Sequence, residues 1–240
     1  MLLAKTAEPH PKLPGTVYTA VADVEAAGGK GVAVVGDVRR EEDVQRAVDT
    51  AIEHFGGIDI AINNASAIAT EPTEELSAKK FDLMMDINVR GTFLLTKAAL
   101  PHLRKSANPH VVTLAPPLNM NPHWLGAHPA YTLSKYGMTL LSLGWAAEYG
   151  QAGIGFSCLW PETYIVTSAV ANLADGSLMS SSRSPEIMGD AAVEILSRPP
   201  ADVNGKCFID SAVLAEAGVT DLSRYGGGDN PILDIFVDKP

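Results

Sequence analysis

The chain has 240 residues, of which 46% are hydrophobic and 19% charged, and its formal net charge is −10. This composition is ordinary for a globular protein, and the length is sufficient to bury a substantial core as one domain. The negative charge argues against nucleic acid or an anionic membrane as a partner. No apolar run approaches the roughly 18 residues that span a bilayer, and the N-terminus lacks the charged and then apolar order of a signal peptide. We therefore expect a cytoplasmic protein without a membrane span.

The apolar pattern predicts helices and strands that alternate along the chain. Helical periodicity covers residues 16–27, 41–55, about 74–104 and 129–149, and short β-branched or continuously apolar runs cover 31–35, 58–62, 110–115 and 153–160. Repeated βα units with nearly continuous apolar strands indicate an α/β fold, with a parallel sheet covered by helices on both faces. We predict one domain over residues 1–220 and an irregular tail over 221–240.

Tyr131 and Lys135 lie four residues apart at the start of the predicted helix 129–149. That spacing places the phenol and the ammonium on one face of a helix. A free tyrosine titrates near pH 10, and a neighbouring cation favours its phenolate, so the pair is suited to general acid-base chemistry. Because the same spacing also occurs by chance on helix surfaces, the pair alone does not define a function.

Two upstream segments accompany this pair. Residues 58–66 form a predicted strand that runs into two asparagines, and residues 84–92 place a lone amide, Asn88, inside a helical run. Together with residues 131–138, these segments resemble the short-chain dehydrogenase/reductase family over about residues 5–210. Residues 4–13 and 116–122 are similar to its hydroxysteroid-dehydrogenase-like protein 2 subgroup. The resemblance implies a Rossmann-like, doubly wound parallel sheet in a single domain.

The resemblance also implies catalytic roles. Tyr131 would exchange a proton with the substrate oxygen, Lys135 would lower the pKa of that phenol and bind the nicotinamide ribose, and Asn88 would hold a water that relays protons. The serine that the family carries after its fifth strand is replaced by Pro116, which has no side-chain donor. Asn119 is a conceivable substitute, although a turn residue is the simpler interpretation. This departure puts the polarisation of a carbonyl in doubt.

The cofactor implied by the resemblance is NADP. Lys5 follows the family's second strand, where a basic residue accommodates the 2′-phosphate, although an ordinary solvated lysine is the alternative. Asp37 resembles the acid that contacts the adenine edge. The other expected contacts are Asn64 and Ala65 at the adenine ribose, Lys135 at the nicotinamide ribose, and Ile165 and Thr167 at the carboxamide.

A glycine-rich βα unit, whose helix N-terminus holds the cofactor pyrophosphate, opens the family's fold. No such unit precedes Lys5, and the glycines at 28–31 are expected to end a helix. Because the family's first strand is central in its sheet, we expect two unpaired inner strand edges and an uncovered apolar face. The chain is thus expected to begin one βα unit late, through a late start site or as a fragment.

These features favour an NADP-dependent oxidoreductase that transfers a hydride to or from a carbonyl or secondary alcohol. Apolar residues around the expected pocket suggest a hydrophobic, lipid-like substrate, namely Leu118, Met120, Trp124, Leu125, Trp160, Tyr164, Leu178 and Met179. The alternative is a catalytically impaired or truncated relative that binds a ligand or serves as an assembly module. The missing serine and the missing glycine-rich turn both favour that alternative.

Two further expectations concern metals and assembly. The six histidines show no metal-ligand spacing, so no metal is expected, and the two cysteines, Cys158 and Cys207, are predicted to be buried thiols. The helices at about 81–104 and 129–149 carry apolar residues on more than one face. Such helices must bury a second face, which predicts a homodimer or homotetramer.

Overall fold

The computed structural model describes residues 1–9, 15–167, 170 and 178–238, and in that part of the chain six strands form two parallel sheets. The first sheet pairs β1 (Leu2–Ala4) with β2 (Ala33–Val35). The second contains, in this order, β3 (Ile60–Asn63), β4 (His110–Thr113), β5 (Gly155–Trp160) and β6 (Lys206–Ile209). The alternation of strands and helices confirms the predicted α/β fold.

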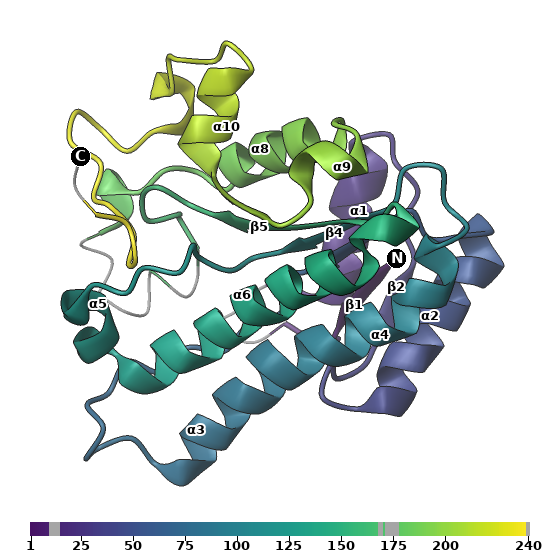
Figure 1. Cartoon of the computed structure of the whole chain (residues 1–240), viewed down its shortest axis with the longest axis horizontal. Coiled ribbons are helices and arrows are strands. Elements are labelled where there is room, and N and C mark those ends of the chain that lie inside the picture. The colour runs from purple at the N-terminus through teal and green to yellow at the C-terminus, as the bar shows by residue number, and fades with distance from the viewer. Residues whose placement is uncertain (10–14, 168–169, 171–177, 239–240) are drawn as a thin grey trace.

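Helices cover both faces of the four-stranded sheet (Figure 1). One face carries α8 (Glu186–Leu196), α9 (Pro200–Val203) and α10 (Asp210–Glu216), and the other carries α4 (Thr92–Leu103) and α6 (Pro129–Tyr149). Successive side chains of β4 point to opposite faces of the sheet. Val111 packs with Leu103 and Trp145 on one face. Val112 packs with Ile187 and Ile195 on the other.

The two-stranded sheet has its own helices. α1 (Val17–Ala26) packs on β1 and β2, and α2 (Glu41–Phe55) packs on both this sheet and α4. α2 buries Val44, Ala47, Val48 and Ala51, which form one stripe at helical spacing. It ends at Gly56, whose φ of 82° is the left-handed conformation that favours glycine at a helix end. The remaining helical elements named in the described residues are α3 (Ala78–Met84), a π-helix over Met85–Gly91, α5 (Pro122–Ala127) and three short 3₁₀ turns over Gly150–Ala152, Met179–Ser181 and Ser223–Tyr225.

The interruption between the sheets coincides with an exposed apolar surface on β3. Ile60 and Ile62 are 42% and 45% exposed, whereas Ala61 and Asn63 on the opposite face are buried. β3 has β4 as its neighbour on one side, and β1 has β2, so each presents one edge without a paired strand in the described residues. In the described residues these two strand edges and the exposed face of β3 are therefore open to contact with another segment.

After α10 the chain returns toward α5, as the yellow trace in Figure 1 shows. Residues 231–238 of this return, called the strap below, contain neither helix nor extended strand pairing. They are fixed instead by backbone bonds such as Tyr164 N to Ile232 O (3.0 Å) and Asp234 N to Glu162 O (2.9 Å). None of the helices described is long and apolar enough to cross a membrane.

Candidate active site

Tyr131 and Lys135 lie on one face of α6, near the residues that follow the carboxyl ends of the sheet strands. Lys135 Nζ donates a hydrogen bond to Leu114 O (2.7 Å), just after β4, and lies 3.5 Å from Ser66 Oγ, after β3. Its ammonium is also 5.0 Å from the ring centroid of Trp160, the last residue of β5. Carboxyl ends of parallel strands are where ligands bind in open α/β sheets, so the pair stands at the expected edge.

Burial controls the protonation of both residues. It raises the pKa of Tyr131 above its usual range, with smaller contributions from Asp234 and Tyr164. It also lowers the pKa of Lys135 to about 8, against an opposing effect of Asp234. The sequence predicts that Lys135 lowers the pKa of the phenol, and that contribution stays a prediction. The net pKa of Tyr131 lies above its usual value in this structure because burial disfavours the phenolate.

Asn88 lies in the π-helix Met85–Gly91, a form that often marks functional positions in helices. Its side chain is fully buried, and its Oδ1 accepts from Ala67 N (2.7 Å) while its Nδ2 donates to Ala67 O (2.9 Å). The same Nδ2 donates to Ser134 Oγ (2.9 Å), and that hydroxyl donates to Tyr131 O (2.8 Å). Asn88 therefore joins the segment after β3 to the tyrosine helix, and its expected water relay stays a prediction.

Pro116 and Asn119, near the place of the family's serine, leave no free side-chain donor there. The carbonyl of Pro116 accepts from Thr139 Oγ1 (2.7 Å). The amide nitrogen of Asn119 donates to Phe236 O (3.2 Å) and to Asp238 Oδ2 (2.8 Å). Asn119 thus holds the strap in place. Its amide nitrogen, considered above as a substitute for the family's serine hydroxyl, is already bound to the strap.

The strap is the part of the site that sequence reasoning missed. Trp160 Nε1 donates to Ile235 O (3.0 Å) and Trp124 Nε1 donates to Asp238 Oδ1 (2.8 Å). Phe236 lies nearly parallel to the ring of Tyr131, with 6.3 Å between centroids and 23° between planes. Residues 231–237 are apolar apart from one aspartate. That composition was the available signal, because an apolar segment outside regular elements must find a surface to cover.

Asp234 brings a third ionisable group to the pair. Its side chain is buried, and burial raises the pKa of its carboxyl to about 7, although Lys135 acts in the opposite direction. A strongly perturbed carboxyl beside a buried lysine and tyrosine is typical of functional sites.

Lys5 and Asp37, predicted from separate segments, lie close together because β1 and β2 pair in parallel. Lys5 Nζ is 3.5 Å from Asp37 Oδ2 and its side chain is 63% exposed. Arg39, which the sequence analysis did not single out, binds the same carboxylate through Nε (3.0 Å) and Nη2 (2.6 Å). This guanidinium holds the pKa of Asp37 well below its usual range. Two cations, Lys5 and Arg39, therefore lie beside the Asp37 carboxylate, and such cations can bind a phosphate.

The other predicted cofactor residues differ in accessibility. Asn64 and Ala65 are exposed just after β3. Thr167 is exposed, and its hydroxyl accepts from Val170 N (3.3 Å). Ile165 is buried in the core beside Leu159, so only its backbone is available to a carboxamide.

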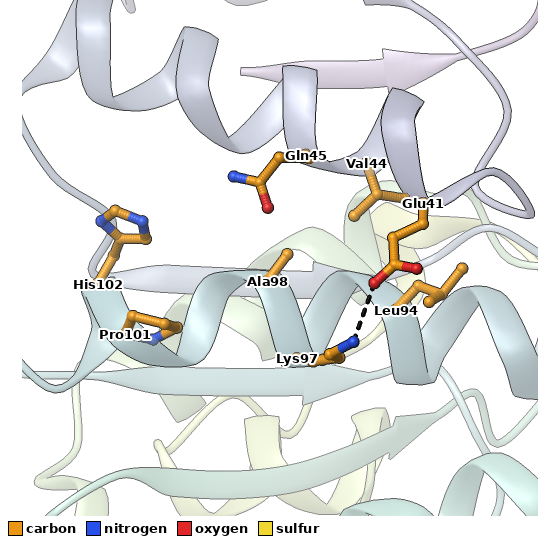
Figure 2. A pocket seen from close by; sticks show the side chains of 8 residues that line it. All are labelled: Glu41, Val44, Gln45, Leu94, Lys97, Ala98, Pro101 and His102. Carbon is orange, nitrogen blue, oxygen red and sulfur yellow. Dashed lines mark hydrogen bonds and ion pairs between the residues drawn. The ribbon is translucent and has the colours of Figure 1, made fainter.

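Two cavities lie near these elements, and one of them adjoins the tyrosine. Figure 2 shows a cavity of about 190 Å³ between α2 and α4, with an ion pair of 2.9 Å between Glu41 and Lys97. None of the predicted site residues lines it. The other cavity, of about 510 Å³, is lined by His123, Trp124, Pro231, Ile232, Leu233, Val237 and Asp238. Because Trp124 and the strap also contact the tyrosine region, this second cavity belongs to the candidate site.

Residues 13–177 match the family model described as short chain dehydrogenase. The chain belongs to this family. Hydroxysteroid dehydrogenase-like protein 2 is 47% identical in Xenopus tropicalis, covering 100% of this chain and 57% of the relative. The corresponding protein of Danio rerio is also 47% identical, covering 99% of this chain and 57% of the relative. The chain thus spans less than two thirds of the length of these relatives.

A solved structure shares the whole architecture. The short chain dehydrogenase of Mycobacterium thermoresistibile matches with a TM-score of 0.93 and 47% identity, over 100% of this chain and 86% of that chain. These similarities confirm the predicted family, the likeness to its hydroxysteroid dehydrogenase-like members and the Rossmann-like fold. Members of the family are oxidoreductases that use nicotinamide cofactors.

Proposed function

We propose that this chain is an NADP-dependent oxidoreductase that acts on the carbonyl or secondary alcohol of a hydrophobic, lipid-like substrate. The observation that carries the proposal is the pair of Tyr131 and Lys135 on one face of α6, at the carboxyl edge of a parallel sheet. In this role the Tyr131 phenol exchanges a proton with the substrate oxygen. Lys135, fixed by Leu114 O, orients the nicotinamide ribose.

The charges at the ends of β1 and β2 support NADP as the cofactor. NADP supplies or accepts the hydride when it is bound. Lys5 and Arg39 both lie at the Asp37 carboxylate, and Lys5 is exposed enough to reach a 2′-phosphate. Asn64 and Ala65 are accessible at the end of β3 for the adenosine portion. The residues present therefore fit a phosphorylated dinucleotide.

The lining of the strap cavity supports a hydrophobic substrate. Trp124, Ile232 and Val237 contribute apolar walls, and His123 and Asp238 contribute the polar groups. A volume of about 510 Å³ falls within the usual range of about 300–1,000 Å³ for small-molecule sites. An apolar body carrying one polar oxygen matches such a lining.

The proposal is tested by Tyr131→Phe in the full chain. This change keeps the ring but removes the exchangeable proton, so turnover of a ketone with NADPH should fall by about 10²–10⁴-fold. NADPH affinity should change little. Tyr149→Phe, at the other end of the same helix, is the matched control and should keep full turnover. An active Tyr131→Phe variant would show that the proton comes from another group.

A second candidate function is a ligand-binding or assembly module without catalysis. Pro116 offers no donor, Asn119 is engaged by the strap, and Tyr131 is buried beneath Phe236. Titration with NADPH followed by fluorescence separates the two functions at their first step. Saturable NADPH binding together with ketone turnover supports the enzyme, whereas binding of an apolar ligand without any turnover supports the module. In either case we propose that the chain forms a homodimer or homotetramer.

A further inference from the structure

Phe236 fills an aromatic recess directly in front of the proposed catalytic tyrosine. The recess is formed by Trp124, Tyr131, Tyr136 and Trp160, whose ring centroids lie 6.1, 6.3, 5.2 and 6.0 Å from that of Phe236. Phe236 itself is only 5% exposed. One side chain from a sequence-distant segment therefore occupies the apolar space that adjoins the phenol.

The position of this ring is fixed by the strap's polar contacts on both sides of it. Trp160 Nε1 binds the carbonyl of the preceding residue, Ile235, and Asn119 Nδ2 binds the carbonyl of Phe236 itself. Asp238 is bound by Trp124 Nε1 and by Asn119. Phe236 has a φ of 72°, a left-handed conformation that is unfavourable for a bulky residue. Such a conformation persists where surrounding contacts determine it, and it concentrates at functional positions.

The strap cavity lies beside the recess and shares a wall with it. Trp124 lines the cavity and also contacts the Phe236 ring, and the next two strap residues, Val237 and Asp238, line the cavity as well. An apolar compound held in this cavity is thus adjacent to Phe236. The Phe236 ring stacks on Tyr131, so it fills the space through which a bulky group beside the carbonyl would approach the phenol.

We propose that Phe236 is the specificity-determining residue of this site and that it limits the size of the group next to the reacting carbonyl. The inference rests on the proposed oxidoreductase function and deepens it by naming the feature of the substrate that is selected. A ketone with a small group beside its carbonyl reaches the phenol with the ring in place. A ketone with large groups on both sides does so only when the ring is absent or displaced.

The kinetic test compares acetophenone with benzophenone, two aromatic ketones that differ in the group beside the carbonyl. With NADPH, Phe236→Ala should raise the ratio of kcat/KM for benzophenone over acetophenone by at least about 10-fold, the lower end of what a hydrophobic pocket discriminates. Phe236→Leu should give an intermediate ratio. Phe208→Ala, a partly buried phenylalanine on β6, is the matched control and should leave the ratio unchanged. An unchanged ratio in a folded Phe236→Ala variant would overturn the proposal.

A binding measurement tests the same inference without turnover. Benzophenone should quench the fluorescence of Trp124 and Trp160 in the cofactor-free full chain, with a dissociation constant about 10-fold lower for Phe236→Ala than for the unmodified chain. Equal dissociation constants would contradict the role of Phe236, whatever the activity. Tighter binding by Phe236→Ala with no turnover of either ketone would reject the oxidoreductase function. It would still support the role of Phe236 in limiting the size of the ligand that fits beside Tyr131. Where thermal unfolding shows that Phe236→Ala does not fold, Phe236→Leu decides both measurements.

Discussion

Tyr131, Lys135 and Asp234 form a buried group of three titratable side chains. Burial raises the pKa values of the tyrosine and the aspartate and lowers that of the lysine, so each neutral form is favoured. The charge of Asp234 opposes the lowering at Lys135 and adds to the raising at Tyr131. The protonation states in the site therefore depend on Asp234 of the strap as well as on the two residues of α6.

The raised pKa of Asp234 predicts a pH-dependent stability. Burial raises the pKa of its carboxyl from 3.8 to about 7 and Asp210 adds to the rise, while the hydrogen bond from Ile235 N and the charge of Lys135 act in the opposite direction. Between these pH values the folded chain keeps a proton that the unfolded chain has lost, so this group's contribution is complete below about pH 4 and is lost as the pH rises to about 7. The lysine's shift, from 10.5 down to about 8, acts in the opposite direction and only above that window.

Asp234→Asn removes this titration. The free energy of unfolding of the variant relative to the original chain should therefore increase between pH 5 and pH 8, by roughly 2–3 kcal/mol. Urea denaturation at pH 5, 6, 7 and 8 measures the difference. Asp229→Asn, an exposed change close to the strap, is the control and should give a curve parallel to that of the original chain. A parallel curve for Asp234→Asn would mean that its carboxyl titrates normally in the folded state.

Lys5 provides the prediction on cofactor choice. Its exposed ammonium lies near a carboxylate that Arg39 already binds, so it is available to a 2′-phosphate. A charge-assisted bond to phosphate is worth about 1–2 kcal/mol. Lys5→Ala should raise the dissociation constant of NADPH about 10-fold and leave that of NADH nearly unchanged, as measured by fluorescence titration. Lys105→Ala, an exposed lysine after α4, should change neither, and an equal loss for both cofactors would show that Lys5 does not contact the 2′-phosphate.

At the scale of elements, the sequence predicts what local periodicity controls. The predicted helices 41–55 and 129–149 coincide with α2 and α6, because apolar spacing and the residues at their ends, Gly56 and Pro129, define them locally. The predicted helix at about 74–104 contains a π-helix that the pattern does not reveal. Its central residue, Asn88, is bound to Ala67 and Ser134, and such long-range contacts leave no periodic trace in the sequence.

The candidate site likewise contains residues that local spacing predicts and residues that only long-range contacts bring together. The spacing of Tyr131 and Lys135 was visible because one helix carries both residues. The positions of Asp234 and Phe236 were not visible, because irregular backbone brings them to α6 through hydrogen bonds from Trp160 and Asn119. The direction of the Tyr131 shift could not be predicted for the same reason. It depends on how deeply the ring is buried, and the strap contributes to that burial.

At the scale of the molecule, the two sheets are joined through helices. α2 packs on the sheet of β1 and β2 and also on α4, which covers the sheet of β3 to β6. The candidate cofactor residues are divided between these two parts, with Lys5 and Asp37 on the first and Asn64, Lys135 and Ile165 on the second. The proposed dinucleotide would contact both, so its binding is expected to stabilise their relative position by mass action.

The outer faces of α4 and α6 lead to the prediction on assembly. Leu133 and Leu140 on α6 are 53% and 58% exposed, and Phe93 on α4 is 43% exposed. Burying a leucine or phenylalanine side chain is worth about 1.5–3 kcal/mol, which favours covering these faces with a second copy of the chain. Light scattering at micromolar concentration should therefore give at least twice the chain mass of 25.3 kDa.

Leu140→Glu tests this interface, because a carboxylate buried without a partner would oppose association. The variant should shift toward the mass of one chain while its circular dichroism remains that of the folded protein. Val193→Glu, which places the same charge at a 61% exposed apolar position on α8, is the matched control and should keep the mass of the original assembly. If Leu140→Glu keeps that mass and Val193→Glu loses it, the subunits meet through α8. If the original chain is a stable monomer, the exposed faces of α4 and α6 do not mediate self-association.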